Sequence, residues 1–356
     1  MSKCRKNFKN NLLHNKDTIT SLKQFENKKY ILPYLNEFIN LKFLDISDCQ
    51  IIELPDLSNL TKLEIIYCND NNLCTLPDLS NLKKLKMLDF SKNELIKLPD
   101  LSNLNNLEEL DCSCNNILQI DITNLTNLIY FNCGNNNKLH QIGDLSKLIN
   151  LKSFCYHSTN LKINDFSKNN NIEIFDCSYN NLIKLPNILH LKKLKKICCS
   201  NNKLTKLPNL SHLNELEYLY IPYNEITEIT NLPINLLNLN IYNNKITKLD
   251  KLPFNLQNLC IENNKLDKLP DLTKIKLLHT LTCYNNLFTN IPIEILKNKN
   301  LKLYQKYNKS KYVKHISTIL NNCINYYYYL EIINYYNTIF LIESLYCKSD
   351  LNFWFF

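Results

Sequence analysis

The fifteen cysteines are the residues of this sequence with the widest chemical repertoire, since a thiol can bind zinc, form a disulfide or act as a nucleophile. Cys112 and Cys114 form a Cys-x-Cys pair, and Cys198 and Cys199 are adjacent. A structural zinc site needs four converging ligands, yet no Cys-x-x-Cys pair occurs. The chain has only two glycines, which excludes a glycine-rich phosphate loop. We therefore expect no metal, no cofactor and no catalytic centre, and the chain is predicted not to be an enzyme.

Whether those thiols form disulfides depends on the redox state of the cellular compartment. Residues 1–9 are basic but lack the apolar stretch that follows in a secretory signal. The uncharged run from Ile332 to Ile342 has 11 residues, too few to cross a bilayer as a helix. We expect an intracellular, cytoplasmic protein (host cytoplasm if it is viral) with reduced cysteines.

The formal net charge of +9 lies on the two flanks of the chain. Residues 1–29 have a net charge of +6 and residues 297–314 have +7, which leaves −4 for the rest. Basic flanks raise one functional alternative, which is association with nucleic acid or with an anionic membrane surface through the C-terminal tail. The acidic remainder argues against nucleic acid, because the largest surface would repel phosphate.

A repeat organises the sequence between these flanks. Residues 85–99 read L-x-x-L-x-L-x-x-N-x-L-x-x-L-P, and the same frame recurs at steps of 20 to 23 residues. Twelve copies begin at Leu41, Leu63, Leu85, Leu107, Leu128, Leu151, Ile172, Leu194, Leu216, Leu236, Leu256 and Leu278. Such self-similarity is the signature of a solenoid.

This pattern closely resembles the leucine-rich-repeat family over roughly residues 41–292. The chain lacks alanine and is rich in Asn, Lys, Ile, Leu and Tyr, which resembles uncharacterised leucine-rich-repeat proteins of A/T-rich genomes such as large DNA viruses of protists. The resemblance implies a leucine-rich-repeat solenoid, the α/β-type horseshoe. Its parallel β-sheet would line the concave face, extended or 3-10 segments the convex face, and helical caps the ends.

The spacing has a physical reason. Side chains alternate across a strand, so the paired leucines of each repeat point inward while their neighbours face outward. One coil cannot bury its own leucines, and neighbouring coils must stack. In the family the repeated Asn forms a hydrogen-bonded ladder. Here Cys49 and Thr159 occupy its place, so we expect the ladder to weaken at both. An extra residue in the fifth repeat predicts a bulge or a hinge within residues 132–165.

Three regions follow from the repeat. Residues 1–40 form a basic N-terminal segment and cap, residues 41–292 the solenoid, and residues 293–356 a lysine- and tyrosine-rich C-terminal cap or tail. Helical spacing over residues 316–327 predicts an amphipathic helix there. Oligomeric state stays open.

The outward positions of the sheet are the candidate binding site, since the family usually binds its partners there. Aspartates occur toward the N-terminal end and tyrosines toward the C-terminal end. Exposed tyrosines bury a large area at low entropic cost. We expect a protein-interaction scaffold whose unidentified protein partner contacts Asp45, Asp89, Asp111, Asp176, Tyr218, Tyr220, Tyr223, Tyr242 and Tyr284. The opposing interpretation is that these side chains only keep the sheet soluble.

Overall fold

A computed structural model describes residues 13–23, 32–163, 168–249, 251–296 and 301–304. The chain divides into two units, residues 1–304 and residues 305–356, and the second lies outside the described residues. The predicted helix at residues 316–327 and the aromatic tail belong to that second unit.

Within the described part, one parallel sheet of 14 strands runs through the first unit. Each repeat supplies one strand, and a further strand joins at each end of the sheet. Neighbours in the sheet are consecutive in the chain apart from β6 and β8, which pair separately. The strands are β1 (Ser21–Leu22), β2 (Phe43–Asp45), β3 (Ile65–Tyr67), β4 (Met87–Asp89), β5 (Glu109–Asp111), β7 (Tyr130–Asn132), β9 (Ser153–Cys155), β10 (Ile174–Asp176), β11 (Lys196–Cys198), β12 (Tyr218–Tyr220), β13 (Asn238–Asn240), β14 (Asn258–Cys260), β15 (Thr280–Thr282) and β16 (Lys302–Tyr304).

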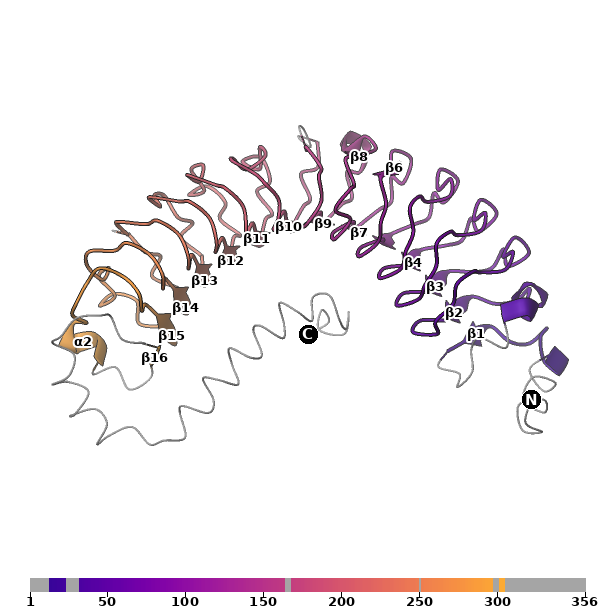
Figure 1. Ribbon diagram of the computed structural model, residues 1–356, viewed down its shortest axis with the longest axis horizontal. Helices are drawn as coiled ribbons and strands as arrows, with labels where there is room; N and C mark the ends of the chain where they lie inside the picture. The colour runs from indigo at the N-terminus through magenta and orange to yellow at the C-terminus, as the bar shows by residue number, and fades with distance from the viewer. Residues whose placement is uncertain (1–12, 24–31, 164–167, 250, 297–300, 305–356) are drawn as a thin grey trace. The chain divides into compact units, whose positions relative to one another are not determined.

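The coils of the first unit stack into a curved solenoid with the strands along its inner side (Figure 1). Identical repeat positions pair across the sheet, as in Leu44 with Ile66 and Leu110 with Phe131. This register places every inward residue above its counterpart in the next coil. The predicted leucine-rich-repeat solenoid is thus confirmed.

The core is a continuous apolar stack. The inward strand residues, such as Leu88 and Leu219, are almost fully buried. Cysteine replaces the second inward leucine in six repeats, at Cys68, Cys112, Cys133, Cys177, Cys199 and Cys283, and each is buried. Free cysteine packs as a small hydrophobe there.

The predicted asparagine ladder is present. In a typical step, Asn93 Nδ2 donates to the carbonyl of Cys68 in the preceding coil and to that of Phe90 in its own, each at 3.0 Å. Its Oδ1 accepts from the N–H of Leu73. At Thr159 the hydroxyl donates to the Tyr156 carbonyl within the same coil and accepts from Leu161 N. Both of these bonds stay within the coil of Thr159, so the link to the coil before it is weaker than at the asparagines, as expected.

The convex side is mostly irregular chain, as predicted. It includes the 3-10 helix η3 (Leu145–Lys147) and a two-stranded sheet of β6 (Gln119–Ile120) and β8 (Gln141–Ile142). At the N-terminal end, the 3-10 helix η2 (Leu32–Glu37) buries Leu35, and Phe38 follows it into the core. A short helix, α2 (Ile293–Leu296), follows β15. The region boundaries at residues 40 and 292 stay predictions.

The sheet is continuous through the irregular middle, because β7 pairs with β9 and β9 with β10. Gly134 lies directly against the His157 ring, which would meet a Cβ at 2.3 Å. The second glycine, Gly143, packs against Asp121 and Thr123 with similar closeness. Both glycines thus occupy places with no room for a side chain.

Candidate functional site

Two rows of outward side chains form the concave face of the sheet. The start row consists of the first residue of each strand from β2 to β15, and the end row consists of the last residue. Register pairs join neighbours along each row, for example Met87 with Glu109 and Asp89 with Asp111. Adjacent strands lie about 4.8 Å apart, so consecutive members of a row are within contact distance.

Sequence reasoning placed nine residues on this face. The structure puts Asp45, Asp89, Asp111, Asp176 and Tyr220 in the end row and Tyr218 in the start row. The other three follow the strand ends by two or three residues; they are Tyr223, Tyr242 and Tyr284. The predicted arrangement is therefore present as geometry, and its role in binding stays a prediction.

The aspartates differ from the expectation in one respect. Asp89 and Asp111 were expected to point into solvent, but they are only 5% and 6% exposed. Bulky neighbours explain this. Tyr67 is the register partner of Asp89 on the preceding strand, and Tyr130 lies on β7, the strand that follows that of Asp111. Asp45 and Asp176 are partly exposed.

Each of the four aspartates also has a structural task that the sequence analysis missed. Each is followed two residues later by serine, and one carboxylate oxygen accepts the serine N–H at 2.8 to 3.0 Å. This Asx turn guides the chain out of the strand. Asn132 does the same toward Gly134 N, so asparagine fits the geometry without the charge. The repeated Asp-x-Ser spacing in the sequence could have indicated this turn.

Hydrogen bonds reach Asp89 and Asp111 unequally. The Asp111 carboxylate accepts from Ser113 N, Ser113 Oγ, Tyr130 Oη and Asn132 Nδ2, at 2.6 to 3.1 Å. Asp89 accepts from Ser91 N at 2.8 Å, and the Ser91 side chain also favours its ionised form. Burial first, and the Asp111 charge second, raise the pKa of Asp89 to about 7.

Asp176 has a different neighbour. His157 Nδ1 lies 3.9 Å from Asp176 Oδ2, close enough for an ion pair when the imidazole is protonated. The register partners of Asp176 on either side are Cys155 and Cys198, so no carboxylate adjoins it in the end row.

The N-terminal half of the face is less purely acidic than predicted. Its start row opens with Phe43, Ile65 and Met87, all partly buried. The Phe43 ring meets Tyr67 edge-on at 5.6 Å, and Lys23 Nζ lies 4.1 Å from the centroid of the Phe43 ring. Apolar and acidic rows thus run side by side, a pairing that fits a segment with both apolar and cationic side chains.

The tyrosines of the C-terminal half form two contacts. Tyr218 and Tyr220 lie with ring centroids 6.3 Å apart, and Lys196 Nζ lies 5.6 Å from the Tyr220 centroid. Tyr223 and Tyr242 meet edge-on at 4.9 Å. Four aromatic rings from neighbouring repeats therefore line one stretch of the face and its rim.

Tyr223 adopts a left-handed backbone conformation with φ of 53°, and Tyr179, two repeats earlier, has φ of 54°. The equivalent residue is asparagine in five repeats, the residue best suited to that conformation, at Asn135, Asn201, Asn243, Asn263 and Asn285. Both tyrosines are large and exposed, at 44% and 50%. Tyr179 was not among the predicted residues. Its position in the repeat, which is equivalent to that of Tyr223, could have indicated that it is exposed.

Glu262 is a further buried acid near the C-terminal end of the face. It is 5% exposed, and its carboxylate accepts from the Thr282 hydroxyl in the next coil. Burial raises the pKa of Glu262. Glu262 lies two residues after the end of β14, and nothing in the sequence indicated this contact.

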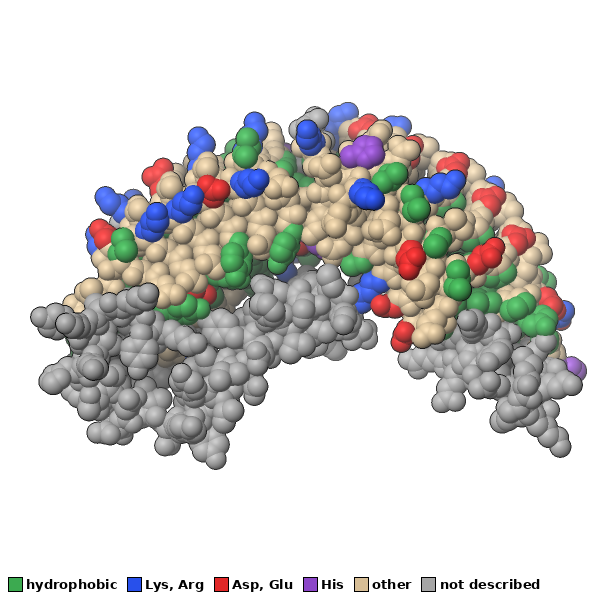
Figure 2. Space-filling view, in the orientation of Figure 1, with side chains coloured by type: hydrophobic (Ala, Val, Ile, Leu, Met, Phe, Trp, Pro, Cys, Tyr) green, Lys and Arg blue, Asp and Glu red, His purple; other side chains and the backbone are tan. Residues whose placement is uncertain are grey.

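Charge is divided along the solenoid. Residues 41–180 carry 18 acidic residues and 12 lysines, whereas residues 181–296 carry nine acidic residues and 14 lysines. Figure 2 shows the same division on the side in view, with lysines gathered toward the β10–β15 end. A basic partner segment would therefore be drawn to the N-terminal half.

The end-row cysteines are poor nucleophiles. Burial raises the pKa of Cys155, Cys198 and Cys260, in the last case to about 12. Thiols in that state hold their proton at neutral pH. In the part of the chain that the structure describes, no group of three or more His, Cys, Asp or Glu residues could hold a metal ion.

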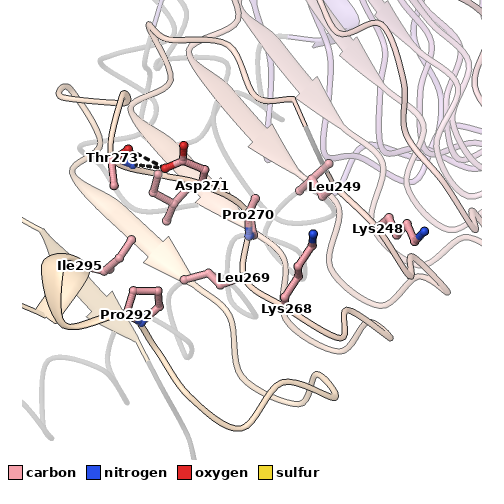
Figure 3. Close-up of a pocket in the computed structure, with 10 residues that line it drawn as sticks. Lys248, Leu249, Lys268, Leu269, Pro270, Asp271, Thr273, Pro292 and Ile295 are labelled. Atoms are coloured by element: carbon pink, nitrogen blue, oxygen red, sulfur yellow. Dashed lines mark hydrogen bonds between the residues drawn. The ribbon is translucent and has the colours of Figure 1, made fainter.

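A cavity of about 400 Å³ lies away from the strand face, among the loops around Pro270 and Pro292 (Figure 3). It forms where repeats of 20 residues give way to repeats of 22. Asp271 faces it but accepts from Thr273 N and Oγ1 at 2.9 and 2.6 Å. That carboxylate is therefore occupied by a local turn.

The basic flanks that carried the alternative function lie largely outside the described residues. No observation in the described part supports nucleic-acid or membrane binding through them. Among the described helices, none has the length and apolarity that a bilayer crossing requires.

Comparison with known proteins places the fold. The family model described as "Leucine Rich repeats (2 copies)" matches residues 39–81 and 192–234. No curated protein sequence matches this chain.

Among solved structures, YopM from Yersinia enterocolitica is similar with a TM-score of 0.64 and 27% identity, over 75% of this chain and 56% of that one. The functional domain of InlJ from Listeria monocytogenes, described as including a cysteine ladder, has a TM-score of 0.55 and 23% identity, covering 82% and 74%. A plant peptide hormone receptor, RGFR1 in complex with RGF2, has a TM-score of 0.59 and 21% identity, covering 76% and 52%.

Proposed function

We propose that this chain, which is a leucine-rich-repeat protein, is a non-catalytic scaffold that holds a protein partner against the concave face of its sheet. The partner would lie across several repeats, with a basic segment beside the aspartates and an apolar segment beside the tyrosines. RGFR1 is a fold-level analogy for a ligand held by such a solenoid, and fold alone carries no function.

The observation that carries this proposal is the tyrosine cluster of Tyr218, Tyr220, Tyr223 and Tyr242. The core does not need these rings, because the inward positions are already filled by leucine and isoleucine. Tyr223 also holds a backbone conformation that costs a non-glycine residue about 1 kcal/mol or more. Large rings placed outward at such a cost are typical of binding surfaces.

The test is affinity capture from the native cell extract with the full chain and with Tyr220→Ala/Tyr242→Ala. A protein retained by the full chain and lost from the double variant supports the concave site. Phe254→Ala is the matched control, since Phe254 is 57% exposed in the segment between β13 and β14. Equal retention by all three chains would remove the tyrosines from the site.

A further inference from the structure

Asp89 and Asp111 form the closest pair of like charges that the sheet register creates on the concave face. They are in-register neighbours at the ends of β4 and β5. Both side chains are over nine-tenths buried. Two carboxylates held side by side away from water repel each other strongly, so the pair is most stable with one negative charge.

The hydrogen bonds decide which acid keeps its charge. Four donors from Ser113, Tyr130 and Asn132 converge on the two oxygens of Asp111. Donors to a carboxylate favour its ionised form. Tyr130 remains a donor, because burial and the Asp111 charge hold its pKa well above the usual value. Asp89 has fewer donors, since only Ser91 supplies them, through its N–H to Oδ1 and through its side chain, so Asp89 is the acid that takes a proton.

The surroundings of Asp89 add negative rather than positive charge. Asp70 lies in the turn after β3 and is paired with Lys92 at 3.2 Å, so that lysine already has a partner. The other titratable groups around the pair include Tyr67 on β3, Glu109 on β5 and Tyr130 on β7, with Asp45 on β2 beyond Tyr67. The thiols of four cysteines also lie near the pair, and burial raises the pKa of each, so they stay neutral: Cys68, Cys112, Cys133 and Cys155.

We propose that Asp89 and Asp111 share one proton, so that the charge of this face, and with it the affinity for a basic segment, changes over the neutral pH range. The shared proton is a property of the isolated chain. Its link to a basic segment rests on the proposed function. Below neutrality Asp89 is neutral; above it the face gains one negative charge, which a lysine or arginine would meet.

The first test follows the aspartate carboxyl carbons of the full-length protein by NMR during a pH titration. One resonance, assigned by its loss in Asp89→Asn, should titrate with a midpoint near 7. In Asp111→Asn the Asp89 midpoint should fall by about one pH unit or more, because the adjacent charge is gone. A midpoint below about 5 in the unaltered chain would overturn the shared proton.

Asp176→Asn is the matched control for that series. Asp176 makes the same turn with Ser178, but cysteines flank it in the end row. It should leave the Asp89 midpoint unchanged. If Asp111→Asn fails to fold, Asp111→Ser provides a second variant that removes the adjacent charge, and the Asp89 midpoint should fall in it as well. An unmoved Asp89 midpoint in either folded variant contradicts the coupling.

The second test uses a peptide of ten lysines as the basic probe. Its affinity should rise about tenfold between pH 6 and pH 8 for the unaltered chain and stay flat for Asp89→Asn. A midpoint near 7 with an affinity independent of pH would support the shared proton and overturn its link to basic segments. Loss of concave binding in the capture experiment would leave the NMR result unaffected, so the two failures are distinguishable.

Discussion

The imidazole of His157 lies where a side chain on Gly134 would have to be, with Cε1 2.3 Å from the position of that Cβ. The two residues are counterparts in adjacent coils, and five of the other ten repeats have serine at this place. A glycine therefore compensates for a histidine in the next coil.

Gly134→Ala should destabilise the protein by about 1 to 3 kcal/mol, because the ring must move out of a packed site. Urea unfolding measures this change. The double variant Gly134→Ser/His157→Ser restores the residue found in neighbouring repeats and should recover most of the loss. Equal stability of Gly134→Ala and the unaltered chain would show that the ring moves freely.

Asn202→Ala should cost about 2 to 4 kcal/mol. Its Nδ2 reaches the carbonyls of Cys177 and Cys199, and its Oδ1 accepts from Leu182 N, so several buried backbone groups lose partners together. Asn235→Ala is the control, since this exposed side chain makes one bond to Asn214 O. Thermal unfolding should separate the two by several degrees, and similar melting temperatures would contradict the role of the ladder.

Thr159→Asn should stabilise the solenoid by about 1 kcal/mol. An amide at this position supplies the donor that other repeats send to the preceding coil, which the hydroxyl cannot reach. Urea unfolding at constant pH gives the change. A destabilised variant would mean that the fifth repeat, with its extra residue, has moved the carbonyl out of range.

Asp176→Asn and Asp176→Ala separate the charge of that residue from its turn. Asparagine keeps the acceptor for Ser178 N and should leave stability within about 0.5 kcal/mol, whereas alanine should cost about 1 kcal/mol. If the charge contributes to binding, both variants weaken capture of a basic partner to a similar degree. Loss of capture in the alanine variant alone would assign the effect to structure.

The raised pKa of Asp89 predicts a pH-dependent stability. An acid whose pKa is higher in the folded state than its usual value near 4 binds more protons folded than unfolded between about pH 4 and 7. Stability from this site is therefore full below pH 4 and falls as pH rises toward 7. Asp89→Asn removes that loss and should be the more stable protein at pH 8, by an amount on the order of 2 to 4 kcal/mol. The two chains should converge below about pH 4, and a constant difference across the range would contradict the shift.

Most of the fold follows from periodicity. The spacing of Leu85, Leu88 and Phe90 within a 22-residue frame fixes a strand, its inward residues and the next coil, so the register could be predicted before any coordinate. The ladder was predicted from the resemblance of the Asn frame to the leucine-rich-repeat family. β1 was not predicted, because Ser21–Leu22 is too short to show a repeat of its own.

The candidate site was predictable in position and less so in character. The repeat pattern predicts which residues face outward, but it does not predict how much of each side chain its neighbours bury. Asp89 illustrates the difference, because Tyr67, its register partner in the preceding repeat, is large. The apolar start row of Phe43, Ile65 and Met87 was not predicted. These residues stand directly before the first inward residue of each strand, whereas the predicted aspartates stand between the two inward residues.

The coil containing Thr159 has a consequence for how the molecule comes apart. Each coil of a linear stack is held only by the coils beside it, so cooperativity passes through every boundary in turn. A boundary with fewer cross-links is a thermodynamic seam, at which melting that starts from one end can stop. Asp45, Asp89 and Asp111 lie on one side of this seam, whereas Asp176 and the tyrosine cluster lie on the other. Partial denaturation can therefore unfold one of the two proposed contact surfaces while the other stays folded. A partner that spans both would bind the two segments into one cooperative unit.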